Sequence, residues 1–152
     1  NSQDLTLIGA LHEPKQQTSS AVIIAHGFTS NKDRERHKKL ADALSHAGRL
    51  SEAETAFTQS IALDPSDSSA HNNLGWARYR MGAHHTAVEA YEAALEIQRS
   101  AGVLYNRGLA LRRLGLDAQA LESFQECLSI DPSHVLARRS VAEFHEPGRT
   151  TN

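Results

Sequence analysis

This chain lacks the sequences that form disulfides, span membranes or direct secretion. Its 152 residues include one cysteine, four prolines and 5% aromatic residues, and a single cysteine excludes an internal disulfide bond. No run approaches the ~20 consecutive apolar residues that a membrane-spanning helix requires. The first residues also lack the basic-then-apolar order of a secretory leader. We therefore expect a cytoplasmic location and no membrane partner.

Charge and metal-ligand patterns are also sparse. The formal net charge is −2, which creates no strong field for nucleic acid or an anionic membrane. The nine histidines show no short ligand spacing on one helix face, and the adjacent His84 and His85 project in different directions. The chain has no glycine-rich phosphate loop and no cysteine pair. We expect no cofactor, no metal and no nucleic-acid partner.

What the chain does contain is one pattern of small and apolar residues that occurs three times. The second copy is Gly82, Ala87, Tyr91 and Leu95, and the third, 33 positions later, is Gly115, Ala120, Phe124 and Leu128. The first copy, 34 positions before the second, is Gly48, Ala53, Phe57 and Ile61. Such a period is typical of helical solenoids, in which each unit buries its apolar face only by stacking on its neighbours.

Each copy predicts two antiparallel helices joined at a glycine, because apolar residues recur at three- and four-residue steps on both sides of that glycine. Asp-Pro-Ser at 64–66 and 131–133 closes two copies, since proline cannot continue a helix and aspartate or serine caps the next one. The predicted pairs are 34–47 with 50–62, 67–81 with 84–98, and 102–114 with 117–129, followed by a last helix at 134–145. Residues 146–152 are expected to fray.

These residues resemble the tetratricopeptide repeat family over residues 34–145. The matching marks are Leu74-Gly75, Gly82, Ala87, Tyr91 and Ala94 in the middle copy, then Gly108, Gly115, Ala120, Phe124, Cys127 and Pro132. The resemblance implies a mainly α fold, a three-repeat solenoid of helical hairpins with a C-terminal capping helix. It also implies a non-catalytic scaffold that binds a protein or peptide. Because Cys127 falls where the family has a small buried residue, we expect it to serve packing rather than chemistry.

Residues 1–33 do not fit the repeat. Two apolar runs, 5–11 and 21–25, predict a short two-stranded β segment, and His26-Gly27-Phe28 follows the second run. This order resembles the start of an α/β-hydrolase domain over residues 1–47, in which the N–H of Phe28 would help form an oxyanion hole. The pentapeptide Gly-x-Ser-x-Gly is absent, so this part has no nucleophile. We do not expect the chain to be an enzyme.

The junction of the two resemblances suggests a chimera that crosses from hydrolase to repeat sequence near residues 46–49. The strands would then form a hairpin on the first repeat helix, pair with a second copy of the chain to form a homo-oligomer, or be disordered. Two alternatives to a peptide-binding scaffold stay open. One is an inactive hydrolase remnant that needs a partner chain to supply the serine, and the other is a recombination product with no evolved function.

The first helices of the three pairs would line the concave face of the solenoid. The candidate groove residues are Lys38, Asp42, Ser45, Asn72, Asn73, Trp76, Tyr79, Arg80, Tyr105, Asn106, Leu109, Arg112 and Arg113. Two aromatic residues beside three arginines suit a peptide with carboxylates and an apolar anchor. In the alternative, Trp76 and Tyr79 are partly buried between helices and the arginines only solvate the surface.

Some members of the resembled family hold a terminal carboxylate with a fixed set of lysine, asparagine and arginine. Lys38 and Asn73 fall on two of those positions, whereas Asp42, Gly102 and Asn106 replace the others. We therefore do not expect this chain to clamp a chaperone tail.

Overall fold

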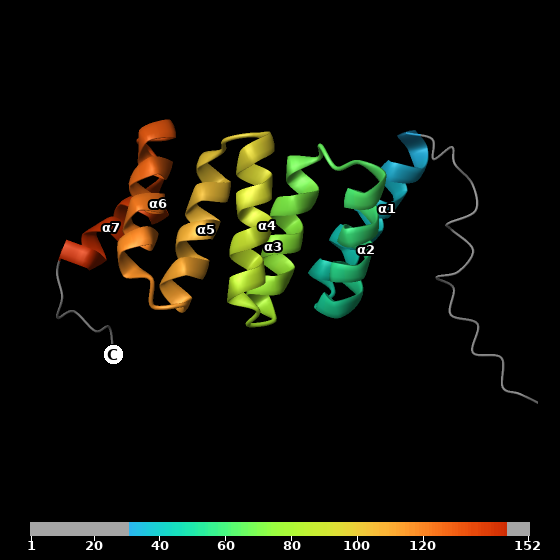
Figure 1. Ribbon diagram of the computed structural model, residues 1–152, viewed down its shortest axis with the longest axis horizontal. Helices are drawn as coiled ribbons and strands as arrows, with labels where there is room; N and C mark the ends of the chain where they lie inside the picture. The colour runs from blue at the N-terminus through green and yellow to red at the C-terminus, as the bar shows by residue number, and fades with distance from the viewer. Residues whose placement is uncertain (1–30, 146–152) are drawn as a thin grey trace, which may run out of the picture.

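The computed structural model describes residues 31–145, and this part of the chain is a row of seven α-helices (Figure 1). They are α1 (Asn31–His46), α2 (Leu50–Leu63), α3 (Ser68–Arg80), α4 (His84–Ile97), α5 (Ala101–Arg113), α6 (Asp117–Ile130) and α7 (Val135–His145). Each helix packs against the next in sequence. The prediction of three helical hairpins followed by one last helix is confirmed for these residues.

The observed helix ends lie within three residues of the predicted ones. The largest difference is at α1, which begins at Asn31 and so extends across the boundary predicted between residues 33 and 34. The two strands predicted at 5–11 and 21–25 and the tail at 146–152 lie outside the described residues. Within 31–145 every regular element is a helix.

One glycine makes the turn inside each of the three helical hairpins. Gly48, Gly82 and Gly115 have φ angles of 77°, 82° and 74°, a left-handed conformation that strains any residue with a Cβ atom. At the second turn the N–H of Gly82 donates to Tyr79 O (3.0 Å), and the N–H of Ala83 donates to Arg78 O (2.9 Å). These bonds satisfy carbonyls at the end of α3. The repeated glycine therefore fixes where each first helix ends.

Each hairpin is held together by a buried aromatic ring from its second helix. Tyr91 of α4 and Phe124 of α6 are fully buried, and each ring lies directly against a glycine of the preceding helix. A Cβ atom added at Gly75 would lie 2.6 Å from Tyr91 Cε1, and one added at Gly108 would lie 2.5 Å from Phe124 Cε1. The repeated spacing in the sequence thus reflects close approach of two helices.

An ion pair replaces an apolar contact in the third hairpin. Arg107 of α5 occupies the repeat position that Leu74 holds in α3, 33 residues earlier. Its guanidinium donates to Glu92 Oε1 of α4 (3.1 Å) and to Ser123 Oγ of α6 (2.9 Å), and Ser123 is fully buried. Arg107 therefore links α5 to both neighbouring helices.

The last helix covers the end of the third hairpin. Cys127 of α6 is fully buried in a cluster with Leu104 and Ala137, the latter from α7. Burial, with a smaller contribution from Asp131, raises the pKa of the Cys127 thiol. This confirms the expectation that Cys127 serves packing.

Candidate functional site

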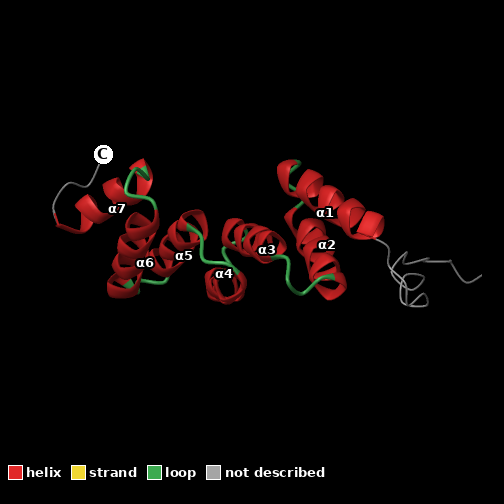
Figure 2. Ribbon diagram, turned by 90° about the horizontal axis from the view of Figure 1, so that it is seen from above, coloured by secondary structure: helices red, strands yellow, loops and turns green. Residues whose placement is uncertain are grey.

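The candidate site is the inner face, which we define as the side of the row formed by the first helices of the hairpins, α1, α3 and α5. Seen from above, α1, α3 and α5 lie on one side of the row, and α2, α4 and α6 lie on the other (Figure 2). Every candidate groove residue lies on one of the three inner helices. The inner face is therefore the surface to search for a binding site.

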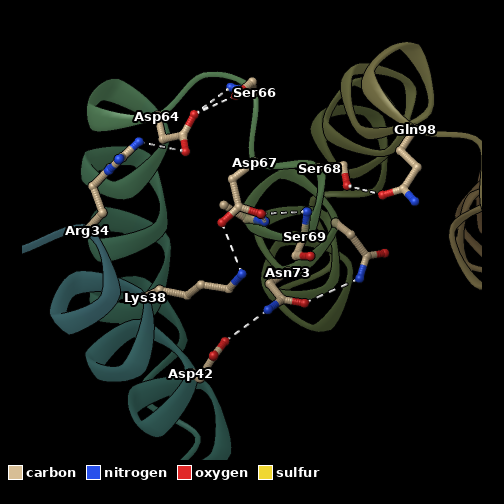
Figure 3. Close-up of polar contacts among 12 residues, drawn as sticks. Arg34, Lys38, Asp42, Asp64, Ser66, Asp67, Ser68, Ser69, Asn73 and Gln98 are labelled. Carbon is tan, nitrogen blue, oxygen red and sulfur yellow. Dashed lines mark hydrogen bonds and ion pairs between the residues drawn. The ribbon is translucent and has the colours of Figure 1, made fainter. Parts of the chain in front are cut away.

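A row of amides crosses the inner face and ends at a carboxylate. Asn106 of α5 donates to Asn72 Oδ1 of α3 (3.1 Å), Asn72 donates to Asn73 Oδ1 (3.3 Å), and Asn73 donates to Asp42 Oδ1 of α1 (2.9 Å). We call these four residues the amide row. The row ends at Asp42, which accepts its last hydrogen bond, the one from Asn73 (Figure 3).

Two of the residues at clamp positions already have partners within the chain. Lys38 Nζ lies 3.0 Å from Oδ2 of Asp67, the residue that caps the N-terminus of α3, and Asn73 is bound to Asp42. Close by, Arg34 of α1 pairs with Asp64 at 3.1 Å (Figure 3). These contacts occupy the two side chains that would bind a terminal carboxylate, so they agree with the expectation that this surface is not such a clamp.

Two aromatic side chains lie at the centre of the inner face. The rings of Trp76 and Tyr79 are stacked with centroids 5.5 Å apart and an interplanar angle of 17°. Trp76 is 38% exposed, whereas Tyr79 is half-buried. Arg113 Nε of α5 donates to the Tyr79 hydroxyl at 3.3 Å. The stacked pair therefore presents one open aromatic surface, that of Trp76.

Two arginines on this face have no carboxylate partner among residues 31–145. Arg80 Nη1 donates only to the carbonyl oxygen of Ser45 (3.3 Å), and Arg113 only to Tyr79. Both side chains are exposed. They lie in the last turns of α3 and α5, where a cation is stabilised by the helix dipole. Both guanidiniums are free to bind an anionic group.

Three of the predicted groove residues are engaged by the C-terminal end of the row. The ring of Tyr105 lies 5.6 Å from that of Phe124 and 4.9 Å from that of His134. Leu109 packs against the cluster that contains Phe124. Arg112 Nη1 pairs with Glu143 Oε2 of α7 at 2.9 Å. The side chains left for a partner are concentrated between α1 and α3.

A pocket of about 250 Å³ opens on the inner face between α1 and α3. It is lined by Asp42, Ser45, His46, Phe57, Asn73, Trp76 and Arg80. Sequence reasoning missed His46 and Phe57. His46 lies 34 residues before Arg80, so the repeat register could have indicated it. Phe57 is a core residue of α2 that reaches the pocket from behind, and the repeat pattern gives no sign of this.

The part of the chain that the structure describes holds no group of three or more His, Cys, Asp or Glu side chains that could bind a metal ion. None of its helices is long and apolar enough to cross a membrane.

Stacked helical hairpins with one polar, partly open face define a helical-repeat scaffold. The chain belongs to the tetratricopeptide repeat family, because models described as tetratricopeptide repeat match residues 38–102 and 101–134. Together these matches cover more than half of the chain.

Curated relatives agree with this assignment. The human tetratricopeptide repeat protein 13 is 27% identical over 135 residues, or 88% of this chain and 16% of the relative. The small glutamine-rich tetratricopeptide repeat-containing protein 2 of Mycosarcoma maydis is 28% identical over 92 residues, or 60% of this chain and 26% of the relative. The chain thus spans about a quarter or less of these relatives' lengths.

Solved structures show the same fold. The first tetratricopeptide domain of Spaghetti (RPAP3), bound to the HSP90 peptide SRMEEVD, has a TM-score of 0.74 at 18% identity and covers 79% of this chain and 96% of that domain. MamA has a TM-score of 0.73 at 23% identity and covers 76% of this chain and 68% of that one.

The findings do not support the hydrolase resemblance or the chimera. A match that covers 88% of a 152-residue chain must begin before residue 20, so the similarity to tetratricopeptide repeat protein 13 extends into the segment assigned to a hydrolase. The hydrolase resemblance rests on the strand pattern with His26-Gly27-Phe28 and on the helix that follows at 34–47, which also fits the repeat. Short apolar runs are weak signals, because they occur in many folds.

Proposed function

We propose that this chain is a non-catalytic scaffold that binds a peptide segment of a partner protein on its inner face. The observation that carries the proposal is the open Trp76 ring beside a pocket of about 250 Å³ and two unpaired guanidiniums, Arg80 and Arg113. An aromatic surface supplies burial at low entropic cost. A guanidinium supplies paired donors for a carboxylate.

Similar domains support this proposal by analogy. The Spaghetti domain carries a bound HSP90 peptide, and the second domain of human RPAP3 carries the HSP70 peptide SGPTIEEVD. The side chains that would receive such a tail differ here, since Lys38 is paired with Asp67 and Asn73 with Asp42. We therefore assign the same face but a different peptide. The cytoplasmic location, the absence of catalysis and self-association through the first residues stay predictions.

A display library of random peptides, selected against the whole chain, tests the proposal. Peptides that bind are expected to lose affinity about tenfold in Trp76→Ala, and several-fold in Arg113→Gln. Glu122→Gln is the matched control, because Glu122 is exposed on the outer helix α6. If every selected peptide binds both inner-face variants as well as the original chain, the inner face is not the binding site and the proposal is wrong.

A further inference from the structure

The pocket between α1 and α3 contains one carboxylate and one guanidinium that do not pair with each other. Asp42 makes no ion pair within residues 31–145, and its only side-chain bond comes from the neutral amide of Asn73. Arg80 binds only a backbone carbonyl oxygen. Both residues line the same pocket. The pocket therefore offers an anion at one point and a cation at another.

The neighbouring charges leave Asp42 available to a ligand. Lys38, one helical turn earlier on α1, is directed to Asp67 at 3.0 Å rather than to Asp42 (Figure 3). The amide row fixes the Asp42 side chain by occupying its Oδ1 atom, while no hydrogen bond within residues 31–145 engages Oδ2. A buried or half-buried carboxylate gains most from a cationic partner when its own position is already fixed.

The two charges are held at different points of the pocket. Asp42 of α1 accepts from Asn73 of α3, whereas Arg80 of α3 donates to the carbonyl oxygen of Ser45 on α1. At about 1.5 Å per residue, Asp42 and Ser45 are offset by roughly 5 Å along α1, and Asn73 and Arg80 by roughly 10 Å along α3. Trp76 lies between Asn73 and Arg80 in the sequence of α3, and Trp76 and Phe57 both line the pocket. The pocket thus combines two charged groups with apolar surface.

From this arrangement we infer that the pocket selects an extended peptide with a lysine or arginine two residues from a glutamate or aspartate. In an extended chain, side chains at i and i+2 point to the same side about 6.6 Å apart, which falls within the offset of roughly 5 to 10 Å along the two helices. The basic side chain binds Asp42 with its aliphatic stem across Trp76, and the acidic side chain binds Arg80. This inference rests on the proposed function and specifies its ligand.

Trp76 makes the inference directly measurable, because it is the only tryptophan in the chain and lines the pocket. The probe is the blocked peptide acetyl-Gly-Lys-Ala-Glu-Gly-amide, titrated to 10 mM while tryptophan emission is recorded. Peptides with glutamine in place of the lysine, or in place of the glutamate, are each expected to bind about three- to tenfold more weakly. A peptide with adjacent Lys-Glu tests the spacing.

Two variants assign each charge to its partner. Asp42→Asn keeps an oxygen that can accept from Asn73 and is expected to abolish the preference for lysine over glutamine, leaving the preference for glutamate. Arg80→Gln is expected to do the reverse. Glu122→Gln and Arg36→Gln are the controls, since both residues are exposed away from the pocket. Far-UV circular dichroism and a denaturation midpoint verify that each variant folds.

The inference is overturned if all four peptides change Trp76 emission equally, if none changes it up to 10 mM, or if the preferences survive both variants. Such a result leaves the proposed function standing when library-selected peptides still depend on Trp76 and Arg113. If no selected peptide depends on those two residues either, the inner face itself is the wrong site, and both proposals fail.

Discussion

Tyr91 is the largest fully buried side chain in the described residues, and its hydroxyl has no hydrogen-bond partner among them. The equivalent residues of the other hairpins are Phe57 and Phe124. Burying an unpaired hydroxyl is unfavourable, so Tyr91→Phe is expected to keep the free energy of unfolding or raise it by up to about 1 kcal/mol. Urea denaturation at pH 7 measures this. Tyr91→Ala, which empties the site, should lose about 3 kcal/mol or more.

Tyr91 also predicts a pH dependence. Burial, with a smaller contribution from Tyr79, raises the pKa of the Tyr91 phenol above its ordinary value. In the unfolded chain the Tyr91 phenol ionises near pH 10, while in the folded chain it stays neutral. Its ionisation therefore leaves the free energy of unfolding unchanged well below about pH 10 and lowers it as pH rises further. Tyr91→Phe should therefore lose less stability than the original chain between pH 8 and pH 11. An equal loss in both proteins would show that Tyr91 does not contribute.

Arg107 tests whether an ion pair can replace a core leucine. Arg107→Ala removes the bonds to Glu92 and Ser123 and leaves a gap between α4, α5 and α6, so a loss of about 1–3 kcal/mol in the free energy of unfolding is expected. Arg107→Leu restores the residue type found at Leu74 and should stay within about 1 kcal/mol of the original chain. Denaturation curves compare the three proteins. A larger loss for leucine than for alanine would contradict this explanation.

At the scale of elements, Asp67 both caps the N-terminus of α3 and pairs with Lys38 of α1. Its Oδ1 accepts from the N–H groups of Ser69 (2.9 Å) and Ala70 (3.1 Å), and its Oδ2 binds Lys38 of α1. Burial alone would raise the pKa of Asp67, but the bonds from Lys38, Ala70 and Ser69 outweigh it, and the pKa is lowered. The carboxylate therefore stabilises both the helix end and the contact between α1 and α3.

Asp67→Ala is expected to lower the free energy of unfolding by about 1–2 kcal/mol at pH 7. Because the pKa of Asp67 is lower in the folded chain, its stabilisation is present above about pH 4 and is lost as pH falls below that value. The difference between the two proteins should thus shrink at pH 3. Asp117→Asn, in the exposed first turn of α6, is the control. A difference that stays constant with pH would contradict the assigned role.

The helices could be predicted from the sequence because each is defined by local signals. Gly48, Gly82 and Gly115 require left-handed turns, and the 33- and 34-residue spacing fixes what lies between them. The pocket could not be predicted, since it depends on how α1 and α3 are turned relative to each other. Contacts made by α7 likewise decide that Arg112 is paired and Arg113 is not, and no short-range pattern contains that information.

At the scale of the whole molecule, stability should vary along the row. Each interior helix packs on neighbours at both sides, whereas α1 and α7 each have only one sequential neighbour in the described chain. In such one-dimensional arrays the terminal units open first. Amide hydrogen exchange read by mass spectrometry is expected to be slowest in α3, α4 and α5 and faster in α1 and α7. Uniform protection across all seven helices would show that the array opens only as one unit.

The position of Cys127 allows local opening of the array to be followed by the reactivity of its thiol. Cys127 is the single cysteine of the chain, and its thiol is fully buried in a cluster with Leu104 of α5 and Ala137 of α7, so a thiol reagent can react only while this packing is open. At low reagent concentration the reaction rate reports the equilibrium between closed and open states. At high concentration it reports the rate constant of opening. The opening of the packing around Cys127 can thus be timed with the native cysteine, and no second cysteine has to be introduced.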